Sequence, residues 1–387
     1  MIFITLAIFV FWLSVGIIFY VYIGYPLLVY IISRLFPKQI KKGDFEPKVS
    51  IIITAYNEEQ DIRGKIENTL AIDYPLEKLQ IIVASDGSTD GTDEIVKEFA
   101  AKGVNLFRQD GRVGKTHTQN KAVEQADGEV ILFSDATTMF QSDVLKALVP
   151  NFADQTVGCV AGRLIYVDES ESGVGTGARS YWNYETSLKE SESKACSLIG
   201  VSGCLYAVRR SAYMPMYPEA CSDFLICTVV YRQGLRSVYE PGAVCTEETN
   251  RQSEKEMQMR VRVISQTFTD LWRNREMLNP LKSGFFAIEL ISHKLLRYSI
   301  PVFLFVLLLT TIFLAFSSDL FFILLVFQIV FYAIALIAWL LEKKGMKSGV
   351  LAMPLYFVLT NLASWVGFYK FLRGERYASW EPIREKS

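Results

Sequence analysis

Three long stretches of the chain carry almost no charge, and they constrain its fold more than any other feature. Residues 1–33 contain no Asp, Glu, Lys or Arg, residues 298–341 contain only Asp319, and residues 348–369 contain none. A helix needs about 20 apolar residues to cross a hydrocarbon core about 30 Å thick. The other residues carry an ordinary share of charge. The sequence therefore predicts a membrane protein with a polar domain between apolar helices.

The basic residues beside these stretches predict how the chain crosses the membrane. Residues 1–36 are expected to cross once, and the basic residues from Arg34 to Lys48 put the N-terminus outside and the middle domain in the cytoplasm. A cleaved signal peptide is disfavoured because no basic residue precedes the apolar run. Residues 298–341 are long enough for a helical hairpin with an outward turn, within a C-terminal membrane region over residues 298–371.

Two further segments, residues 348–369 and 280–297, combine apolar residues with basic residues within or beside them. Residues 348–369 are long enough to cross once more, but basic residues flank both ends, so the side of the C-terminus stays open. Residues 280–297 mix apolar side chains with Lys282, His293 and Arg297. This mixture favours an amphipathic helix along the cytoplasmic interface over a core helix.

The charge balance and the cysteines exclude several classes of function. The chain has 40 Lys and Arg against 41 Asp and Glu, with no long basic block, so nucleic-acid binding has no electrostatic support. The six cysteines include no Cys-x-x-Cys pair, and two histidines are too few to suggest a zinc site. We expect reduced, structural thiols in a cytoplasmic domain.

The middle of the chain, over residues 45–275, alternates short β-branched runs with helical segments. The runs VSIIIT, LQIIVAS, VNLFR and EVILFSDA are separated by polar helical stretches, which predicts βαβ units and a mostly parallel sheet. Asp86 and Asp135 directly follow two of these runs, at the sheet edge where α/β proteins bind ligands. Each alone could be a turn or capping residue, but with Glu58 and Lys115 nearby they favour a site for a charged, metal-bound ligand.

Two glycine-containing segments resemble phosphate-binding motifs without matching them. GRVGKT at residues 111–116 lacks the first glycine of a P-loop, because Gln109 stands there. GVGTGA at residues 173–178 has the wrong spacing for a dinucleotide fingerprint and does not follow a strand, so we expect a flexible loop.

Five motifs in a fixed order carry a family resemblance over residues 48–275. They are VSIIITAYNEE (49–59), IIVASDGSTDGT (81–92), GRVGKTHTQNKAVEQADGEVILFSDATTMF (111–140), SLIGVSGCLYAVRR (197–210) and SDF (222–224). Together they resemble glycosyltransferase family 2, in particular membrane-embedded members with a Rossmann-like GT-A fold. The flanking helices are similar to those of bacterial polysaccharide synthases such as poly-N-acetylglucosamine synthase-like transferases.

The resemblance implies roles for residues on the donor side. Those expected to hold the nucleotide and its diphosphate are Ala55, Tyr56, Glu58, Asp86, Lys115, Asn120 and Asp135, with Asp86 on the base or ribose. Asp135 belongs to the D-x-D element that holds Mg²⁺ or Mn²⁺ on the diphosphate. Thr137 replaces the second Asp of that element. A hydroxyl is a weaker ligand for a hard cation than a carboxylate, which puts metal affinity and metal choice in doubt.

The resemblance also implies a catalytic base and a phosphate-binding arginine. Asp223 is the expected base, although its residue type and position also suit a helix N-cap. MRVRV at residues 259–263 corresponds to the family's Q-x-x-R-W, with Arg262 kept for the diphosphate and Val263 in place of Trp. Gly203, Tyr206 and Arg209 either line the acceptor side or serve the core.

The leading hypothesis is an inverting, metal-dependent transferase in the inner membrane, with several crossings and a cytoplasmic catalytic domain. It would move one sugar from a nucleotide-diphosphate donor to a lipid-linked or saccharide acceptor in cell-surface polysaccharide or glycolipid synthesis, in contact with membrane lipids. One alternative is a processive synthase that extrudes its product, against which Val263 counts. Another is a non-catalytic nucleotide-sugar-binding component of an export complex, which Thr137 alone favours.

Overall fold

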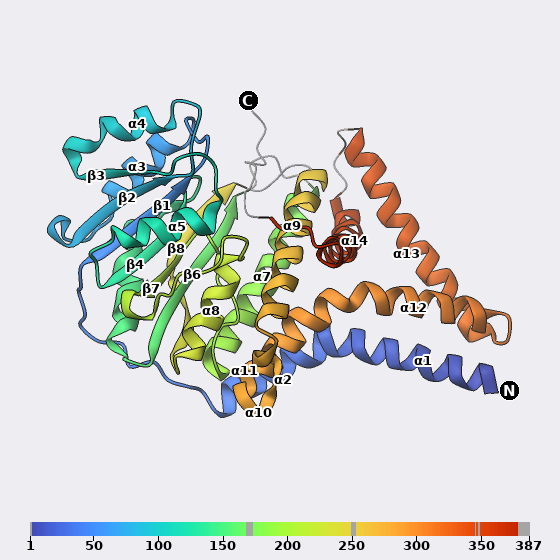
Figure 1. Ribbon diagram of the computed structural model, residues 1–387. Coiled ribbons are helices and arrows are strands. Elements are labelled where there is room, and N and C mark those ends of the chain that lie inside the picture. The colour runs from blue at the N-terminus through green and yellow to red at the C-terminus, as the bar shows by residue number, and fades with distance from the viewer. Residues whose placement is uncertain (1, 168–172, 249–252, 345, 347–348, 378–387) are drawn as a thin grey trace.

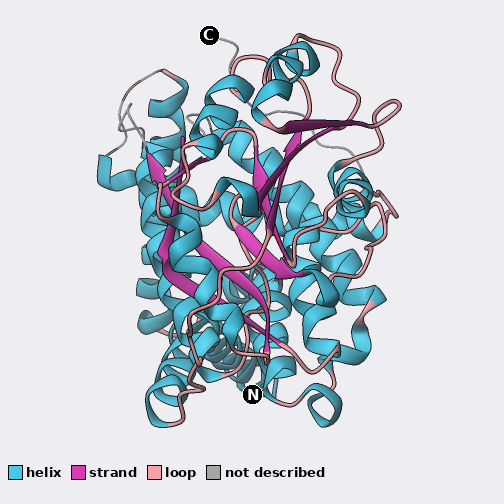
Figure 2. Ribbon diagram, turned by 90° about the vertical axis from the view of Figure 1, so that its left-hand side faces the viewer, coloured by secondary structure: helices cyan, strands magenta, loops and turns pink. Residues whose placement is uncertain are grey.

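The computed structural model describes residues 2–167, 173–248, 253–344, 346 and 349–377, and its centre is an eight-stranded mixed sheet. The strands run in the order β3-β2-β1-β4-β7-β6-β8-β5. They are magenta in Figure 2, with helices on either side of the sheet. Their bounds are β1 Val49–Ala55, β2 Leu79–Ser85, β3 Val104–Arg108, β4 Val130–Asp135, β5 Met139–Phe140, β6 Val157–Val167, β7 Tyr206–Arg209 and β8 Arg236–Glu248.

The first half of the sheet has the predicted parallel pairing, whereas the second half is mixed. β1 pairs in parallel with both β2 and β4, and β3 pairs in parallel with β2. β7 is antiparallel to β4 and to β6, and β5 is antiparallel to β8. β6 and β8 pair in parallel, so parallel pairing returns in the second half of the sheet. The expectation of a mostly parallel sheet therefore fails only where β7 and β5 enter it as antiparallel strands.

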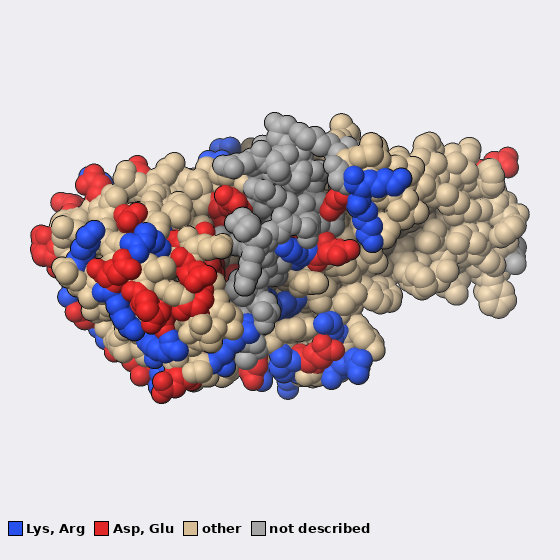
Figure 3. All heavy atoms as spheres, turned by 90° about the horizontal axis from the view of Figure 1, so that it is seen from above, with Lys and Arg blue, Asp and Glu red and all other residues tan. Residues whose placement is uncertain are grey.

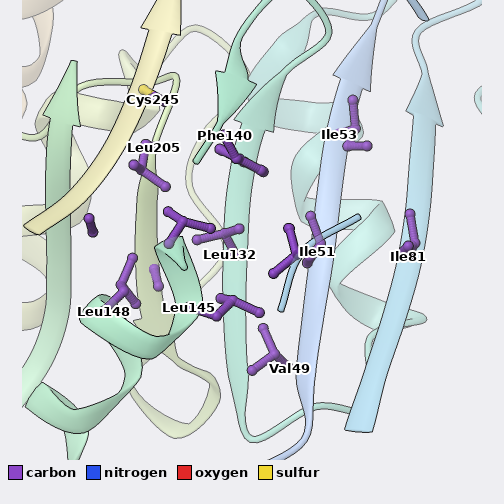
Figure 4. Packing of buried hydrophobic residues seen from close by; sticks show 14 of the residues in the cluster. Val49, Ile51, Ile53, Ile81, Leu132, Phe140, Leu145, Leu148, Leu205 and Cys245 are labelled. Atoms are coloured by element: carbon purple, nitrogen blue, oxygen red, sulfur yellow. The ribbon is translucent and has the colours of Figure 1, made fainter. Parts of the chain in front are cut away.

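Helices cover both faces of this sheet, and two apolar cores result. Successive side chains of a strand point to opposite faces. Val49, Ile51 and Ile53 of β1 therefore pack on one face with Leu132 (Figure 4), while Ile52 packs on the other. All seven residues of β1 are buried, as expected for a central strand covered on both sides. The helices that complete the domain are α3 Ile62–Leu70, α4 Thr92–Glu98, α5 Lys115–Glu124, α6 Val144–Leu148, α7 Gly173–Ala195, α8 Ser222–Arg232 and α9 Ser253–Arg273.

The start of α7 corrects one expectation. Residues 173–178, expected to form a flexible loop, instead begin this 23-residue helix. Glycine lowers helix propensity by about 1 kcal/mol per residue, but tertiary packing can outweigh propensity. The later part of α7 packs through Leu188 and Ala195 against Tyr25 and Val29 of the N-terminal helix. Packing of its C-terminal half against the N-terminal helix therefore stabilises α7.

Four apolar helical segments flank the domain, each long and apolar enough to cross a membrane. They are Ile2–Leu35, Phe285–Ala315, Asp319–Lys343 and Gly349–Leu372. Within them lie α1 Ile2–Phe19, α2 Tyr25–Leu35, α11 Phe285–Glu289, α12 Arg297–Ala315, α13 Asp319–Lys343 and α14 Ala352–Leu372, and the short α10 Pro280–Ser283 precedes α11. α1, α12 and α13 extend away from the domain (Figure 1). Their end of the molecule is almost free of charged side chains (Figure 3).

Residues 280–297 are divided among several elements. α10 is separate, whereas α11 passes through a π-helical turn at Leu290–Leu296 into α12 without a break. Phe286 and Leu290 are buried in a cluster with Phe224 of α8 and Leu271 of α9. This segment therefore joins the apolar helices to α8 and α9 of the domain.

Candidate active site

The ends of β1, β2 and β4 meet at one edge of the sheet. Ala55 pairs with Ser85, and Thr54 pairs with Asp135, so these strand ends stand level. The backbone N–H of Asp86 donates to the carbonyl of Ala55 at 2.9 Å. Polar residues that follow β1, β2 and β4 thus come together at one edge, as the sequence pattern predicts.

Asp86 is fully buried, and it holds the loop before α5. Its Oδ1 accepts hydrogen bonds from the backbone N–H of Val113 at 3.0 Å and from the hydroxyl of Thr118 at 2.8 Å. Both of its carboxylate oxygens accept from the N–H of Gly114. The observed contacts of Asp86 are those of a residue that fixes residues 113–118 against β2.

The loop after β1 is tied to the loop after β2. Asn57 has φ of +54°, a left-handed conformation that Asn tolerates better than most residues. Its side chain accepts from the N–H of Thr89 at 2.8 Å, and the N–H of Glu58 donates to the Thr92 hydroxyl at 2.8 Å. The Tyr56 ring lies 4.1 Å below the guanidinium of Arg112. Tyr56 and Glu58 therefore stand beside the Asp86 loop.

Lys115, Asp135 and Asp223 form the centre of the site. The Lys115 ammonium donates to Oδ1 of Asp135. A Cβ placed on Gly203 would lie 3.2 Å from Oδ2 of Asp223 and 3.3 Å from Nζ of Lys115. Burial opposes the charged form of Lys115, but Asp135 and Asp223 outweigh it and hold its pKa above the usual value.

Arg262 reaches the same cluster from α9. Burial lowers its pKa, and the carboxylates of Asp223 and Asp135 oppose that shift, so both lie within electrostatic reach. Its Nε is buried and has no hydrogen-bond partner among the described residues. A buried donor without a partner is costly in a folded protein, so this group is suited to an anionic ligand.

The Thr137 hydroxyl contacts a carboxylate, that of Glu247, which the sequence pattern did not predict. Its hydroxyl donates to Oε1 of Glu247 in β8 at 3.0 Å. Glu247 follows Asp135 by more than a hundred residues, and no spacing pattern links them. Within the described residues, no group of three or more His, Cys, Asp and Glu side chains could hold a metal ion alone. Oxygen donors from Asp135 and Thr137, with Glu247 beside them, do suit a hard divalent cation whose other ligands come from a diphosphate and water.

Two buried ionisable residues hold loops that carry site residues, and the sequence pattern did not predict either of them. Lys65 donates to the carbonyl of Thr138 at 2.7 Å, and burial lowers its pKa to about 7. Asp270 accepts from the N–H of Cys221 at 3.0 Å and from the Tyr217 hydroxyl. Burial raises the pKa of Asp270 to about 8. Lys65 therefore anchors the loop after Asp135, and Asp270 anchors the start of α8 beside Asp223.

Three other candidates have structural contacts instead. The Asn120 side chain donates to the carbonyl of Met216 at 2.6 Å and accepts from the Tyr213 hydroxyl at 2.7 Å. Tyr206 is fully buried and stacks on Phe133, with ring centroids 4.9 Å apart. Arg209 donates to the carbonyl of Phe152 at 2.6 Å. Of the three residues considered for the acceptor side, Gly203 borders the charged cluster, and the buried Tyr206 hydroxyl lies within electrostatic reach of Asp223.

All six cysteines are buried and free of disulfides. Cys204 and Cys245 lie close to the site, and the hydrogen bond between them and their burial raise the pKa of Cys204 well above its usual value. The Cys204 thiol therefore stays protonated near neutral pH, consistent with a structural role.

The fold and the site together define a class of protein. A mixed sheet with carboxylates at the ends of its parallel strands is the arrangement of a GT-A fold. Over its whole length the chain is similar to the mannosyltransferase PcManGT from Pyrobaculum calidifontis, whose structure contains GDP-Man and Mn²⁺. The TM-score is 0.73 at 22% identity, with 95% of this chain and 99% of that chain covered.

Sequence comparison identifies the domain more specifically. Residues 50–215 match the family model Glycosyl transferase family 2, so the chain carries a glycosyltransferase family 2 domain. It is 26% identical over 204 residues to poly-beta-1,6-N-acetyl-D-glucosamine synthase of Staphylococcus aureus, covering 51% of this chain and 49% of the relative. It is 30% identical over 151 residues to glycosyltransferase AglE of Haloferax volcanii, covering 38% and 49%. The chain spans about half the length of the curated relatives it matches.

Proposed function

We propose that the protein transfers one sugar, with inversion at the anomeric carbon, from a nucleotide-diphosphate donor to an acceptor held beside Asp223. The observation that carries this proposal is the single cluster of Lys115, Asp135, Asp223 and Arg262. The cluster combines cationic side chains that can bind a diphosphate with a carboxylate that can accept a proton. The family 2 domain supports the same reaction class.

Cations on the donor side stabilise the leaving group. As the bond between the anomeric carbon and the diphosphate breaks, negative charge grows on the diphosphate oxygens. A bound Mg²⁺ or Mn²⁺, held by Asp135 and Thr137, would supply positive charge there. Lys115 stays charged in the cluster and Arg262 has a buried donor to offer, so both are suited to bind these oxygens.

Asp223 acts on the acceptor side as the general base. The acceptor hydroxyl oxygen bonds to the anomeric carbon, its proton moves to Asp223, and the nucleoside diphosphate leaves with the electron pair of the broken bond. Attack from the face opposite the leaving group inverts the anomeric centre. The position of Asp223 across Gly203 from Lys115 supports this division of the site into two sides.

The nucleoside binds at the loops that follow β1 and β2. Ala55, Tyr56 and Glu58 border this region, and Tyr56 offers an aromatic face for the base. Asp86 is fully used in holding the loop before α5. Its contact with the base or ribose would require one of these hydrogen bonds to be exchanged for one to the nucleotide. Asn120 does not contact the nucleotide but holds α5 in place through its contacts with Tyr213 and Met216.

The reaction takes place at the cytoplasmic membrane face of a multi-pass inner-membrane protein. Basic residues that follow the first apolar helix support this orientation. The acceptor is lipid-linked or a saccharide, and the product belongs to cell-surface polysaccharide or glycolipid synthesis. The four apolar helices beside the catalytic domain support this location.

A processive synthase is the second candidate, and the similarity to a poly-N-acetylglucosamine synthase favours it. Val263, at the position of the family's Trp, packs beside Cys221 and Phe224 in an apolar cluster. It offers no aromatic face to a growing chain. We therefore favour single transfer, and the size of the product by gel filtration separates the two.

The direct test uses the full-length protein in detergent with GDP-mannose, UDP-N-acetylglucosamine and other nucleotide sugars. Nucleoside diphosphate release is measured with Mn²⁺, with Mg²⁺ and with a chelator. Asp135→Asn and Asp223→Asn are expected to lower turnover by about 10² to 10⁴. Asp127→Asn removes an exposed carboxylate at the far end of β4 and should leave turnover unchanged.

Two results would contradict the proposal. One is no turnover of any donor by wild-type protein that binds a nucleoside diphosphate by calorimetry, which would favour a non-catalytic binding component. The other is turnover that survives both substitutions in variants that remain folded by thermal unfolding.

A further inference from the structure

A cavity of about 280 Å³ lies among the apolar helices, outside the cluster that contains Asp223. Arg260 and Ile264 of α9, Tyr22 of the N-terminal helix, and Arg297 at the start of α12 form part of its wall. Residues 353–364 of α14 form another part. The cavity is therefore bounded by the first, second and fourth apolar segments and by the helix that also carries Arg262.

Hydrogen-bond donors dominate the polar part of this wall. Two guanidinium groups, from Arg260 and Arg297, are joined by hydroxyls and an amide from α14, namely Tyr356, Thr360 and Asn361. The hydroxyls of Tyr356 and Thr360 already donate to Glu256 and to the carbonyl of Phe357. The two guanidinium forks are therefore the groups that match the oxygens of a phosphate.

Each arginine is held in place by a carboxylate. Nε of Arg260 donates to Oε1 of Glu256 at 2.7 Å, and Arg297 pairs with the buried Glu185 of α7. These pairs fix the two side chains and lower the cost of ordering them when a ligand binds. A guanidinium has five N–H donors, more than one carboxylate can accept, so such a pair can also bind a phosphate.

The cavity lies where the head of a membrane lipid would be. Arg297 is the first residue of α12, whose following 18 residues carry no charge. The wall also includes the apolar side chains of Met353 and Phe357. A lipid whose tail lies among the apolar helices would bring an anionic head group to this level.

Cationic side chains connect the cavity to the proposed base. Nζ of Lys294 lies 5.8 Å from the ring centroid of Tyr298, which lines the cavity, and 5.7 Å from that of Phe224, next to Asp223. Lys189 of α7 donates to the Ser202 hydroxyl at 3.0 Å, in the loop that contains Gly203. The charge of Asp223 acts on Lys189. The cavity and the base are therefore linked through Lys294 and Lys189.

We propose that this cavity binds the phosphate of a lipid-linked saccharide, and that Lys294 and Lys189 position the saccharide so that its hydroxyl reaches Asp223. This inference rests on the proposed transferase function and selects the lipid-linked acceptor from its two acceptor classes. The phosphate stays in the cavity and takes no part in bond making or breaking, since the transfer itself is the one given above.

The test measures binding of radiolabelled dodecyl phosphate to the full-length protein in phosphatidylcholine nanodiscs. Dodecanol and inorganic phosphate serve as competitors, one lacking the anion and the other the tail. Wild-type protein is expected to bind dodecyl phosphate saturably, and both competitors should be at least tenfold weaker. If inorganic phosphate competes as well as dodecyl phosphate itself, the site binds a free anion. If dodecanol competes equally well, the arginines do not contribute to binding. Either result overturns the proposal.

Two variants probe the cavity in different ways. The double variant Glu185→Gln with Arg297→Gln removes the arginine together with its partner, and buried His293, which also contacts Glu185, keeps its contact with Glu192. Thr360→Phe fills the cavity and keeps every charge. Both should weaken dodecyl phosphate binding at least tenfold, while Lys282→Gln, an exposed cation on α10, should leave it unchanged. Unchanged binding in both cavity variants would overturn the proposal.

Donor hydrolysis in the absence of acceptor separates this inference from the function on which it rests. The double variant should retain the slow release of nucleoside diphosphate, because the donor site lies around Asp135. Loss of lipid binding with hydrolysis intact supports the inference. No hydrolysis by wild-type protein that binds dodecyl phosphate normally would instead contradict the transferase function.

Discussion

At the scale of single residues, the candidate site depends on how little space separates the groups around Asp223. Gly203 lies between this carboxylate and Lys115, and any side chain there would push on both. Carboxylate and ammonium groups at the ends of flexible side chains can shift by a few tenths of an ångström, so a methyl group is tolerated sterically. Catalysis is more sensitive than folding to such a shift.

Gly203→Ala should therefore lower turnover about tenfold or more while leaving the thermal midpoint of unfolding nearly unchanged. Steady-state kinetics and thermal unfolding of the same preparation check this. Gly200→Ala is the matched control in the same loop, because its new methyl group would make only ordinary contacts, the nearest at 3.4 Å. Equal losses of turnover in the two variants would refute a specific role for the space at Gly203.

Glu247 gives a second prediction, about metal affinity. Since it accepts a hydrogen bond from Thr137, it orients the weaker of the two proposed cation ligands. Substitution of groups that orient metal ligands typically costs 10- to 100-fold in affinity. Glu247→Gln should raise the Mn²⁺ concentration for half-maximal binding in the presence of a nucleoside diphosphate by about tenfold, measured by calorimetry. Glu248→Gln changes an exposed neighbour and should have no effect. An unchanged Mn²⁺ affinity in Glu247→Gln would show that Glu247 does not contribute to cation binding.

Asp270 gives a prediction about pH. Its pKa in the folded protein, about 8, lies above the ordinary value of 3.8, mainly because of burial. The folded state therefore binds an extra proton between these values. This stabilisation is complete below about pH 4 and is lost as the pH rises toward 8. Relative to Asp270→Asn, wild-type protein should lose stability with a slope of up to about 1.4 kcal/mol per pH unit. Thermal unfolding from pH 5 to 9 checks this, and parallel curves would exclude the shift.

At the scale of elements, α9 presents different residues to the proposed donor site and to the cavity among the apolar helices. Arg260 and Arg262 are two positions apart, about 200° around a helix, so they face different surroundings. Arg262 is coupled to Asp223 and Asp135, whereas Arg260 contacts Glu256 and Tyr356. One helix thus borders both the proposed reaction centre and the apolar helices.

The N-terminal helix is attached to the domain by a buried polar contact. The Tyr25 hydroxyl donates to Oε1 of Glu192 in α7 at 2.6 Å, and Nδ1 of His293 lies 2.7 Å from the same oxygen. Hydrogen bonds to charged groups contribute about 1.5 to 3 kcal/mol. Tyr25→Phe should lower the free energy of unfolding by that amount, measured by thermal unfolding in detergent. Tyr30→Phe lies on the exposed side of the same helix and should be neutral. A loss as large for Tyr30→Phe would assign the effect to the detergent-facing surface.

At the scale of the whole molecule, both ends of α14 stay against the catalytic domain. Nζ of Lys343, at the end of α13, lies 3.8 Å from Oε1 of Glu254 in α9. Beyond α14, the side chain of Gln266 in α9 donates to the carbonyl of Tyr377 at 2.7 Å. α14 is seen nearly end-on beside α9, whereas α12 and α13 extend away from the domain (Figure 1). α14 therefore packs beside α9 of the domain.

This arrangement predicts that the C-terminus lies on the side of the catalytic domain. Green fluorescent protein fused after residue 387 should be fluorescent in cells, and alkaline phosphatase fused there should be inactive. Alkaline phosphatase inserted after Ser317, in the turn between α12 and α13, is the matched control and should be active. Active phosphatase at the C-terminus would require α14 to cross.

The sequence by itself determined the apolar flanking helices, the parallel pairing of the first four strands and the position of Asp86 and Asp135 at one sheet edge. Each of these follows from a local pattern, namely a run without charge, a β-branched run before a polar cluster, or an Asp directly after a strand. Neighbouring parallel strands end at one edge, so Asp86 and Asp135 could be placed near each other without coordinates.

The tertiary structure alone decided which distant residues complete the site. Glu247 approaches Thr137 only because β8 returns to pair with β6 and β5. Asp270 reaches Cys221 only because the last turns of α9 lie beside the start of α8. The antiparallel pairing of β7, the helical start of α7 and the position of α14 beside α9 likewise depend on packing between segments far apart in the chain. Such contacts are selected by the free energy of the whole fold, in which packing outweighs local propensity.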